Sequence, residues 1–347
     1  MDDEPARAAD TARAIEANAA AALLAIGRAG GGDERDEGGL CWTIGGSPLA
    51  YHNAVVRADL APEAADAAID ASIAALRARG VPGSWHVGPS MRPADLGARL
   101  AARGFVAVGD EPAMALDLAA PPAPAPPPPR GLGVALVRDE RALGAWGEVL
   151  SAGFDGADEG AAWVIETFRR LGWGESSPFR HFVARFEWLP VATGSLFLHE
   201  GVAGIYFVFT SPRQRRRGVA AALTRALLDD ARALGARLAV LHASEMGYGV
   251  YRRLGFREYG RLRRYEWSPG SGPSERARLA HPLRKGLDFA RDHDTLQPSC
   301  RPSRVPKRSA PASPCRSARR SRRMPFCSPS CRATRASALR RATPKSR

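Results

Sequence analysis

A short arginine-rich stretch carries residues whose types and spacing suit the binding of an anion. It reads SPRQRRRGVAAAL at 211–223 and places four arginines directly before Gly218 and a run of helix-forming residues. If a strand ends before these arginines and a helix starts near Gly218, unpaired backbone N–H groups lie beside the positive end of the helix dipole. Such a helix start binds phosphate without any side chain, and glycine lets the anion approach the backbone. The stretch predicts a site for a phosphorylated ligand, against two alternatives: a solvated basic loop and a nucleic-acid patch.

A second stretch, LHASEMGYGVYRRLGF at 241–256, places a phenol at a helical spacing from a helix cap. Ser244 is of a residue type that caps helix starts, and Tyr251 lies two turns later on nearly the same side of the helix. A tyrosine with its ordinary pKa of about 10 is protonated at neutral pH and can donate a proton to a leaving group. The alternative is a half-buried aromatic residue whose hydroxyl caps a backbone carbonyl.

The charge is distributed unevenly along the chain. All 347 residues together have a formal net charge of +14, but residues 268–347 hold 20 Lys and Arg against 4 Asp and Glu, a net of +16. Residues 1–267 hold 30 against 32, a net of −2. Because a nearly neutral body provides no attracting field, a specific nucleic-acid partner is not expected. The tail at 268–347 lacks helix and strand periodicity, and from Pro298 onward it consists mainly of Ser, Arg, Pro and Ala; we expect it to be disordered.

The cysteines and apolar residues provide no signal for a metal site, a disulfide framework or a membrane span. Four of the five cysteines lie in the basic tail, and their spacing contains no C-x2-C pair, so no metal is expected. The acidic N-terminus lacks the pattern of a secretory signal. No apolar run reaches the roughly 18 residues needed to span a bilayer. We therefore expect a cytoplasmic protein with no membrane partner.

Proline marks one boundary along the chain. Residues 119–130, AAPPAPAPPPPR, cannot form a helix or a central strand, because proline lacks an amide donor and fixes an extended backbone. A second boundary falls at SPGSGPSE, where the patterned sequence ends. We expect four parts: a first domain at 11–118, a proline-rich linker at 119–130, a second domain at 131–267 and the basic tail at 268–347.

The second domain alternates strand and helix patterns, which predicts a mixed α/β fold around a central sheet. One helix has the clearest pattern, with Ala220, Leu223 and Leu227 on one face and a stop at Gly235. The expected strands are 133–137, 181–186, 191–198, 203–210, 237–241 and 262–267, and the expected helices are 140–151, 159–171, 219–234 and 245–254.

The first domain shows a shorter version of the same alternation. We expect a hairpin around Gly45 and Gly46, a helix from Pro62 to Gly80, a strand in SWHVGPS and a helix in DLGARLAARGF. This last helix and the helix with Tyr251 both end in Gly-Phe. Aligned on that dipeptide, Leu100 stands where Tyr251 stands. The pattern predicts a duplication in which one copy carries a hydroxyl group and the other does not.

The two chemical stretches together resemble a known family. Pro212, Arg215, Gly218 and Ala220 match the P-x-x-R-x-x-G-x-G/A pattern of the GNAT superfamily of acyl-CoA-dependent N-acetyltransferases. The 241–256 stretch resembles the next strand and helix of that superfamily, ending in Y-x-x-x-GF. The resemblance covers 131–267. Residues 38–118, which retain W-H-V-G-P and GF but lack R-x-x-G-x-G/A, resemble the degenerate first GNAT-like domain of tandem members.

The resemblance implies a fold, a co-substrate and a set of site residues. It implies two tandem copies of the GNAT fold and direct transfer of an acetyl group from acetyl-CoA to a primary amine in a ternary complex, with no acyl-enzyme. It assigns Tyr251 as the general acid, and it implies that β-strand amides near the end of 203–210 hold the pantetheine and the thioester carbonyl. The implied cofactor-binding residues are Val208, Thr210, Arg215, Arg216, Arg217, Gly218, Val219, Ala220 and Ser244.

The sequence does not identify the general base, the acceptor or the oligomeric state. The general base could be Glu200, Glu245, His181 or His242, or water could relay the proton. The acceptor could be a small metabolite, an antibiotic, a peptide N-terminus or a lysine side chain, and the protein could form a homodimer. The main alternative function is a CoA-binding sensor or interaction protein that keeps the fold without turnover.

Overall fold

The computed structural model describes residues 4–124, 126–153, 158–173 and 177–270. The expectation of a disordered tail therefore lies, from residue 271 onward, outside the described residues. Within these ranges no helix is long and apolar enough to cross a membrane.

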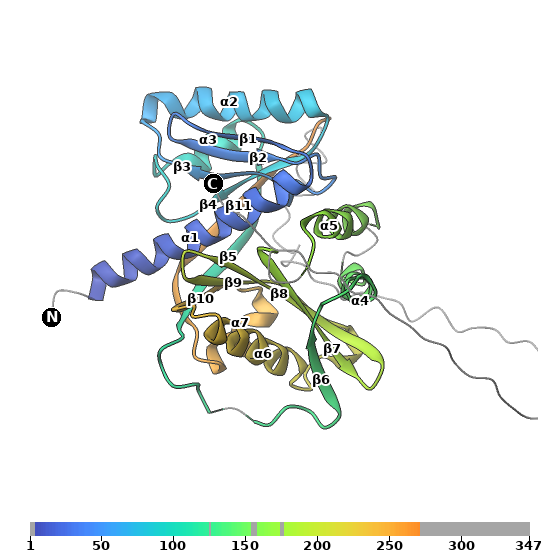
Figure 1. Ribbon diagram of the computed structural model, residues 1–347. Helices are drawn as coiled ribbons and strands as arrows, with labels where there is room; N and C mark the ends of the chain where they lie inside the picture. The colour runs from blue at the N-terminus through green and yellow to red at the C-terminus, as the bar shows by residue number, and fades with distance from the viewer. Residues whose placement is uncertain (1–3, 125, 154–157, 174–176, 271–347) are drawn as a thin grey trace, which may run out of the picture. The chain divides into compact units, whose positions relative to one another are not determined.

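One mixed sheet of 11 strands runs through the described chain, in the order β1-β2-β3-β4-β11-β5-β10-β9-β8-β7-β6 (Figure 1). This confirms the expected mixed α/β class. The strands are β1 (Asp33–Glu37), β2 (Leu40–Ile44), β3 (Asn53–Ala58), β4 (Gly83–Val87), β5 (Val106–Asp117), β6 (Leu132–Leu136), β7 (Phe179–Phe186), β8 (Leu189–His199), β9 (Val202–Thr210), β10 (Leu238–His242) and β11 (Arg257–Trp267).

Helices cover both faces of the sheet. The helices are α1 (Glu4–Ala29), α2 (Pro62–Arg79), α3 (Leu96–Ala102), α4 (Glu140–Ser151), α5 (Asp158–Leu171), α6 (Val219–Ala233) and α7 (Glu245–Arg253), with short 3-10 turns η1 (Ala50–His52) and η2 (Pro212–Gln214). On one face, α6 and α7 bury the core of the second half and α2 and α3 bury that of the first. On the other face lie α1, α4 and α5. We refer to this second side as the α1 face.

The two halves repeat one order of elements and exchange a strand. The series β3-α2-β4-α3-β5 recurs as β9-α6-β10-α7-β11, and the first two strands of each series are parallel neighbours. However, β11 lies between β4 and β5, and β5 lies between β10 and β11. Each half therefore completes the sheet of the other, which supports the predicted duplication.

The register of β5 with β11 locates the symmetry between the halves. Glu111 pairs with Leu262, and the flanking pairs are Asp110 with Arg263 and Pro112 with Arg261. The alignment on the two Gly-Phe dipeptides makes Asp110 equivalent to Arg261 and Pro112 equivalent to Arg263. One flanking pair is therefore the equivalent of the other. A pseudo-two-fold axis therefore passes through the Glu111–Leu262 pair.

Helix α1 crosses both halves on one face of the sheet and was not expected from the sequence (Figure 1). Its buried side chains are Ile15, Asn18, Ala22, Leu23 and Ile26. Alanine occupies many of the remaining positions of α1. The buried face is therefore only slightly more hydrophobic than the exposed face, and the sequence shows no clear helical pattern. The hydroxyl of Tyr206 on β9 donates to Asn18 Oδ1 at 2.7 Å, which ties α1 to the second half.

Two further elements of the first half differ from expectation. Strands β2 and β3 pair antiparallel, as expected, but the connection between them contains η1 rather than a tight turn at Gly45 and Gly46. The tight glycine turn is at Gly38 and Gly39, which have positive φ values of 61° and 77° and join β1 to β2.

The strand exchange predicts that neither half folds alone. A fragment of residues 131–270 lacks β4 and β5, so β10 loses one neighbour, β11 loses both, and each exposes unpaired backbone groups. We expect this fragment and the fragment 1–124 to aggregate separately, and to form a soluble 1:1 complex when expressed together. Size-exclusion chromatography with circular dichroism checks this. A monomeric, native-like 131–270 fragment would contradict the interdependence.

Candidate functional site

The loop at 211–218 and the start of α6 form an uncapped helix N-terminus. Gly218 has a left-handed φ of 79° and stands at the N-cap without a side-chain hydrogen bond. A Cβ built on Gly218 would make van der Waals contact with the Pro129 ring at 3.8 Å, so a side chain there meets no clash. The first helical amide with an acceptor belongs to Ala222, which donates to Gly218 O at 3.0 Å. Among described residues, the amides of Val219 and Ala220 have no acceptor and are available to an anion.

The arginines of the loop divide into two pairs. Arg215 Nε donates to Thr210 O at 3.2 Å, and its guanidinium lies 5.7 Å from the centre of the Phe209 ring. Arg217 bonds to Gln214 and lies over the Phe186 ring at 5.0 Å.

These two arginines shape the loop and add charge to it. Arg213 and Arg216 are exposed, and neither bonds to another residue in the described ranges. Arg216 also has a left-handed φ of 59°. The pair projects free positive charge beside the uncapped helix start.

Next to this loop, β9 and β10 separate. Their parallel pairing ends at Gly204 and Val240, so the last six residues of β9 have no neighbour on that side. On its other side, β9 has a bulge against β8 in which Val208 has no register partner, and Phe207 adopts a left-handed φ of 53°. The hydroxyl of Thr210 is buried without a partner in the described chain. The gap thus leaves one edge of β9 without a strand partner in the described chain, where an extended ligand could bond to its backbone.

Tyr251 and Ser244 lie on one side of α7, as expected. Ser244 caps the helix, because its Oγ accepts from Gly247 N at 3.2 Å. A Cβ on Gly247 would lie 2.8 Å from the Tyr251 ring, so the absence of a side chain at Gly247 leaves room for the ring. The ring packs edge-to-face against Phe256 with centroids 5.8 Å apart. Burial raises the pKa of Tyr251 to about 12, so its hydroxyl is a proton donor at neutral pH.

Leu100 occupies the position of Tyr251 in the first half. Phe105 N donates to Leu100 O at 3.1 Å, and Phe256 N donates to Tyr251 O at 3.1 Å. The loop before α2 also lacks the arginines and spans only the three residues between β3 and α2. The first half therefore has neither the anion site nor the phenol.

Three of the four candidate bases lie in unsuitable places. Glu200 is in the turn before β9, at the opposite end of that strand from Thr210. Glu245 is exposed in the first turn of α7, where a carboxylate stabilises the helix dipole. His181 bonds through Nδ1 to Ser195 Oγ at 2.7 Å inside a cluster of aromatic rings, and burial lowers its pKa to about 3.

The fourth candidate, His242, belongs to a polar cluster buried under α1. The cluster joins side chains from both halves that the sequence analysis did not connect: Tyr51, His86, Glu111, Tyr206, His242 and Arg264. Arg264 donates to Glu111 Oε1 at 2.9 Å. Only the strand register brings these residues together, so no local sequence signal could have found the cluster.

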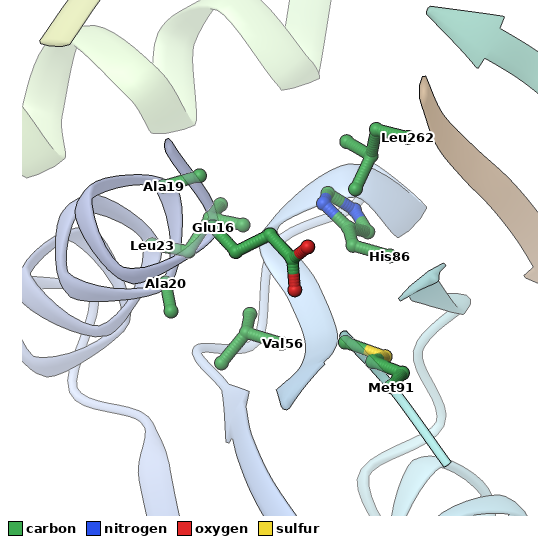
Figure 2. Close-up of a pocket in the computed structure, with 8 residues that line it drawn as sticks. All are labelled: Glu16, Ala19, Ala20, Leu23, Val56, His86, Met91 and Leu262. Atoms are coloured by element: carbon green, nitrogen blue, oxygen red, sulfur yellow. The ribbon is translucent and has the colours of Figure 1, made fainter. Parts of the chain in front are cut away.

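A small hollow of about 10 Å³, with room for about one water molecule, lies on the α1 face beside this cluster. It is lined by Glu16, Ala19, Ala20, Leu23, Val56, His86, Met91 and Leu262, and Figure 2 shows the Glu16 carboxylate pointing into it. No residue of the loop at 211–218 lines it. Within the described ranges, no group of three His, Cys, Asp or Glu residues could hold a metal ion.

Comparisons with known proteins support one family. Residues 200–259 match the family model described as an acetyltransferase (GNAT) domain. A solved GCN5-related N-acetyltransferase from Kribbella flavida is 21% identical with a TM-score of 0.60, over 75% of this chain and 97% of that one. A conserved protein of unknown function from Staphylococcus epidermidis is 14% identical with a TM-score of 0.51, over 68% and 93%. No curated protein matches the chain.

The matched segment contains the loop, α6, β10 and α7, which carry the uncapped helix start and Tyr251. The similarity to the Kribbella flavida structure spans both halves and shows a shared fold. These two findings show that residues 200–259 match a GNAT acetyltransferase domain and that the chain shares the fold of a GCN5-related N-acetyltransferase.

Proposed function

We propose that residues 131–267 form the catalytic half of an acetyl-CoA-dependent N-acetyltransferase. The diphosphate of acetyl-CoA would bind at the amides of Gly218, Val219 and Ala220, with Arg213 and Arg216 adding charge. The pantetheine would extend into the gap between β9 and β10 and bond to the free amides near Val208. Acetyl-CoA is a substrate here, and the unpartnered edge of β9 and the uncapped start of α6 fit such a ligand.

Transfer would proceed by direct attack of a primary amine on the thioester. Amides of the β9 bulge would stabilise the negative charge that develops on the carbonyl oxygen. Tyr251 would donate its proton to the departing sulfur, since burial keeps the phenol protonated. The observation that carries the proposal is the combination of an uncapped, arginine-flanked helix start with a buried phenol on the next helix. The first half, which lacks both, would complete the sheet.

Mass spectrometry of the intact protein tests direct transfer. After incubation with acetyl-CoA alone, the protein mass should be unchanged, and acetylated product should form only when an amine is added. A protein that gains an acetyl group without an amine, and then passes it on, would overturn direct transfer.

The basic tail is expected to play no part in this reaction. Because β11, the last strand of the described residues, ends at Trp267, we expect deletion of 271–347 to leave stability, acetyl-CoA affinity and transfer unchanged. The tail's net charge should give only salt-sensitive, sequence-independent binding to nucleic acid, which the deletion removes. Thermal melting, calorimetry and a salt series with unrelated DNA duplexes measure these effects. Loss of transfer with acetyl-CoA affinity preserved would show that the tail belongs to the working enzyme.

A further inference from the structure

We propose that His242 is the base that takes the proton from the acceptor amine, and that the amine reaches the thioester from the α1 face. This inference rests on the proposed acetyl transfer and adds the residue that the sequence left open.

The position of His242 places it at the mouth of the gap between β9 and β10. It is the last residue of β10 and lies two positions beyond Val240, where pairing with β9 ends. Val240 packs against Ile15 of α1, and the side chain of His242 lies on the same face because strand residues alternate. Tyr251 packs with Leu241 on the opposite face. A thioester in the gap would therefore have the phenol on one side and the imidazole on the other.

The pseudo-two-fold axis supplies a comparison within the molecule. His242 pairs with Ala113 of β5, and His86 pairs with Arg264 of β11. In the alignment on the two Gly-Phe dipeptides, Arg264 is the residue equivalent to Ala113. The two histidines therefore occupy equivalent positions in the two halves.

Their surroundings differ. His86 has a hydrogen-bond partner, since its Nε2 bonds to Ser84 Oγ at 3.0 Å. The centre of its ring lies 4.8 Å from that of the Tyr51 ring. His242 Nε2 is buried and has no partner in the described chain. A buried polar atom without a hydrogen-bond partner destabilises the protein, and a ligand that bonds to it removes part of that cost. A hydrogen bond from a bound amine would satisfy this atom.

Burial keeps the His242 imidazole neutral. Burial lowers its pKa, and the carboxylate of Glu111 on β5 partly opposes this effect. A neutral imidazole at pH 7 can accept a proton. The titratable and charged groups of this face are Glu16 from α1, Tyr51 from η1, His86 from β4, Glu111 from β5, Tyr206 from β9 and Arg264 from β11.

The neutral amine nitrogen attacks the carbonyl carbon, and His242 Nε2 takes the proton that the nitrogen loses as the C–N bond forms. The C–S bond then breaks, and the sulfur takes the proton of Tyr251. Solvent returns the proton from the imidazolium to the phenolate, so the amide and the free thiol are the only products.

The experiment compares His242→Gln with His86→Gln in the full-length protein, using an amine that the wild type acetylates. His242→Gln should lower kcat at pH 7 by about 10²-fold or more, because general base catalysis typically contributes that much. Acetyl-CoA affinity by calorimetry should stay within about two-fold, a difference near 0.4 kcal/mol. His86→Gln should retain nearly all of kcat, provided that circular dichroism shows both variants folded.

The pH profile gives a readout that a structural role would not change. A base must be unprotonated, so wild-type kcat/KM should fall as the pH falls through the pKa of His242. In His242→Gln this acid limb should be absent. A His242→Gln variant with wild-type kcat, or one that keeps the acid limb, would overturn the role of His242 while leaving acetyl transfer intact. Failure of the wild type to acetylate any primary amine would overturn both proposals.

Discussion

Tyr251→Phe should lower kcat by roughly 10²-fold or more and leave acetyl-CoA affinity unchanged, because it removes a proton donor and keeps the ring. The ring of Tyr251 packs against Phe256 in the core, and phenylalanine preserves that contact. The thiolate of CoA would then leave without a positioned acid. Steady-state and single-turnover kinetics, measured where chemistry limits the rate, give the size of the loss.

Tyr248→Phe provides the matched control on the same helix. Among the described residues, the Tyr248 hydroxyl accepts a single long hydrogen bond, from Arg252 at 3.5 Å. We expect kcat within about two-fold of wild type for this variant, because a weak exposed hydrogen bond contributes little. If Tyr251→Phe behaves like Tyr248→Phe, then Tyr251 is a core aromatic residue and not the acid.

Gly218→Asp should weaken acetyl-CoA binding by at least ten-fold, or about 1.4 kcal/mol. The new carboxylate would occupy the space above the uncapped amides of α6 and repel the diphosphate. Aspartate also tolerates a left-handed backbone better than most residues, so the φ of 79° need not prevent folding. Calorimetric titration with acetyl-CoA measures the change.

Gly235→Asp separates the effect on binding from the effect of backbone strain. Gly235 follows the other end of α6, has a φ of 77° and has no other residue within 4 Å of a built Cβ. The same substitution there imposes the same strain far from the proposed diphosphate site. We expect reduced thermal stability in both variants and reduced acetyl-CoA affinity in Gly218→Asp alone. Equal acetyl-CoA affinities in the two folded variants would show that the diphosphate does not bind at this loop.

Much of the second half could be predicted from local sequence signals. Gly218 and Ser244 mark helix starts through backbone and side-chain capping, and Gly235 marks a helix end. The helix predicted at 140–151 matches α4, and the one at 219–234 ends within one residue of α6. Such signals suffice because each depends on residues within one or two turns.

The remaining features depend on pairings between distant residues. Strand β5 contains Asp110 and Glu111, which weaken its apolar pattern, and its neighbours β10 and β11 lie more than 100 residues away. The register that makes His86 and His242 equivalent follows from these pairings alone. The separation of β9 from β10 was implied by family resemblance, but its limits at Gly204 and Val240 come from the structure. The roles of the site residues remain predictions.

Amine-dependent release of CoA from acetyl-CoA tests the central claim most directly. The full-length protein is incubated with acetyl-CoA and a panel of primary amines, and free thiol and acetylated amine are quantified in the same reactions. The proposal predicts that at least one amine yields thiol and N-acetyl product in equal amounts, and that Tyr251→Phe strongly reduces both. A protein that binds acetyl-CoA but releases no CoA with any amine would contradict the claim and would be a non-catalytic CoA-binding protein.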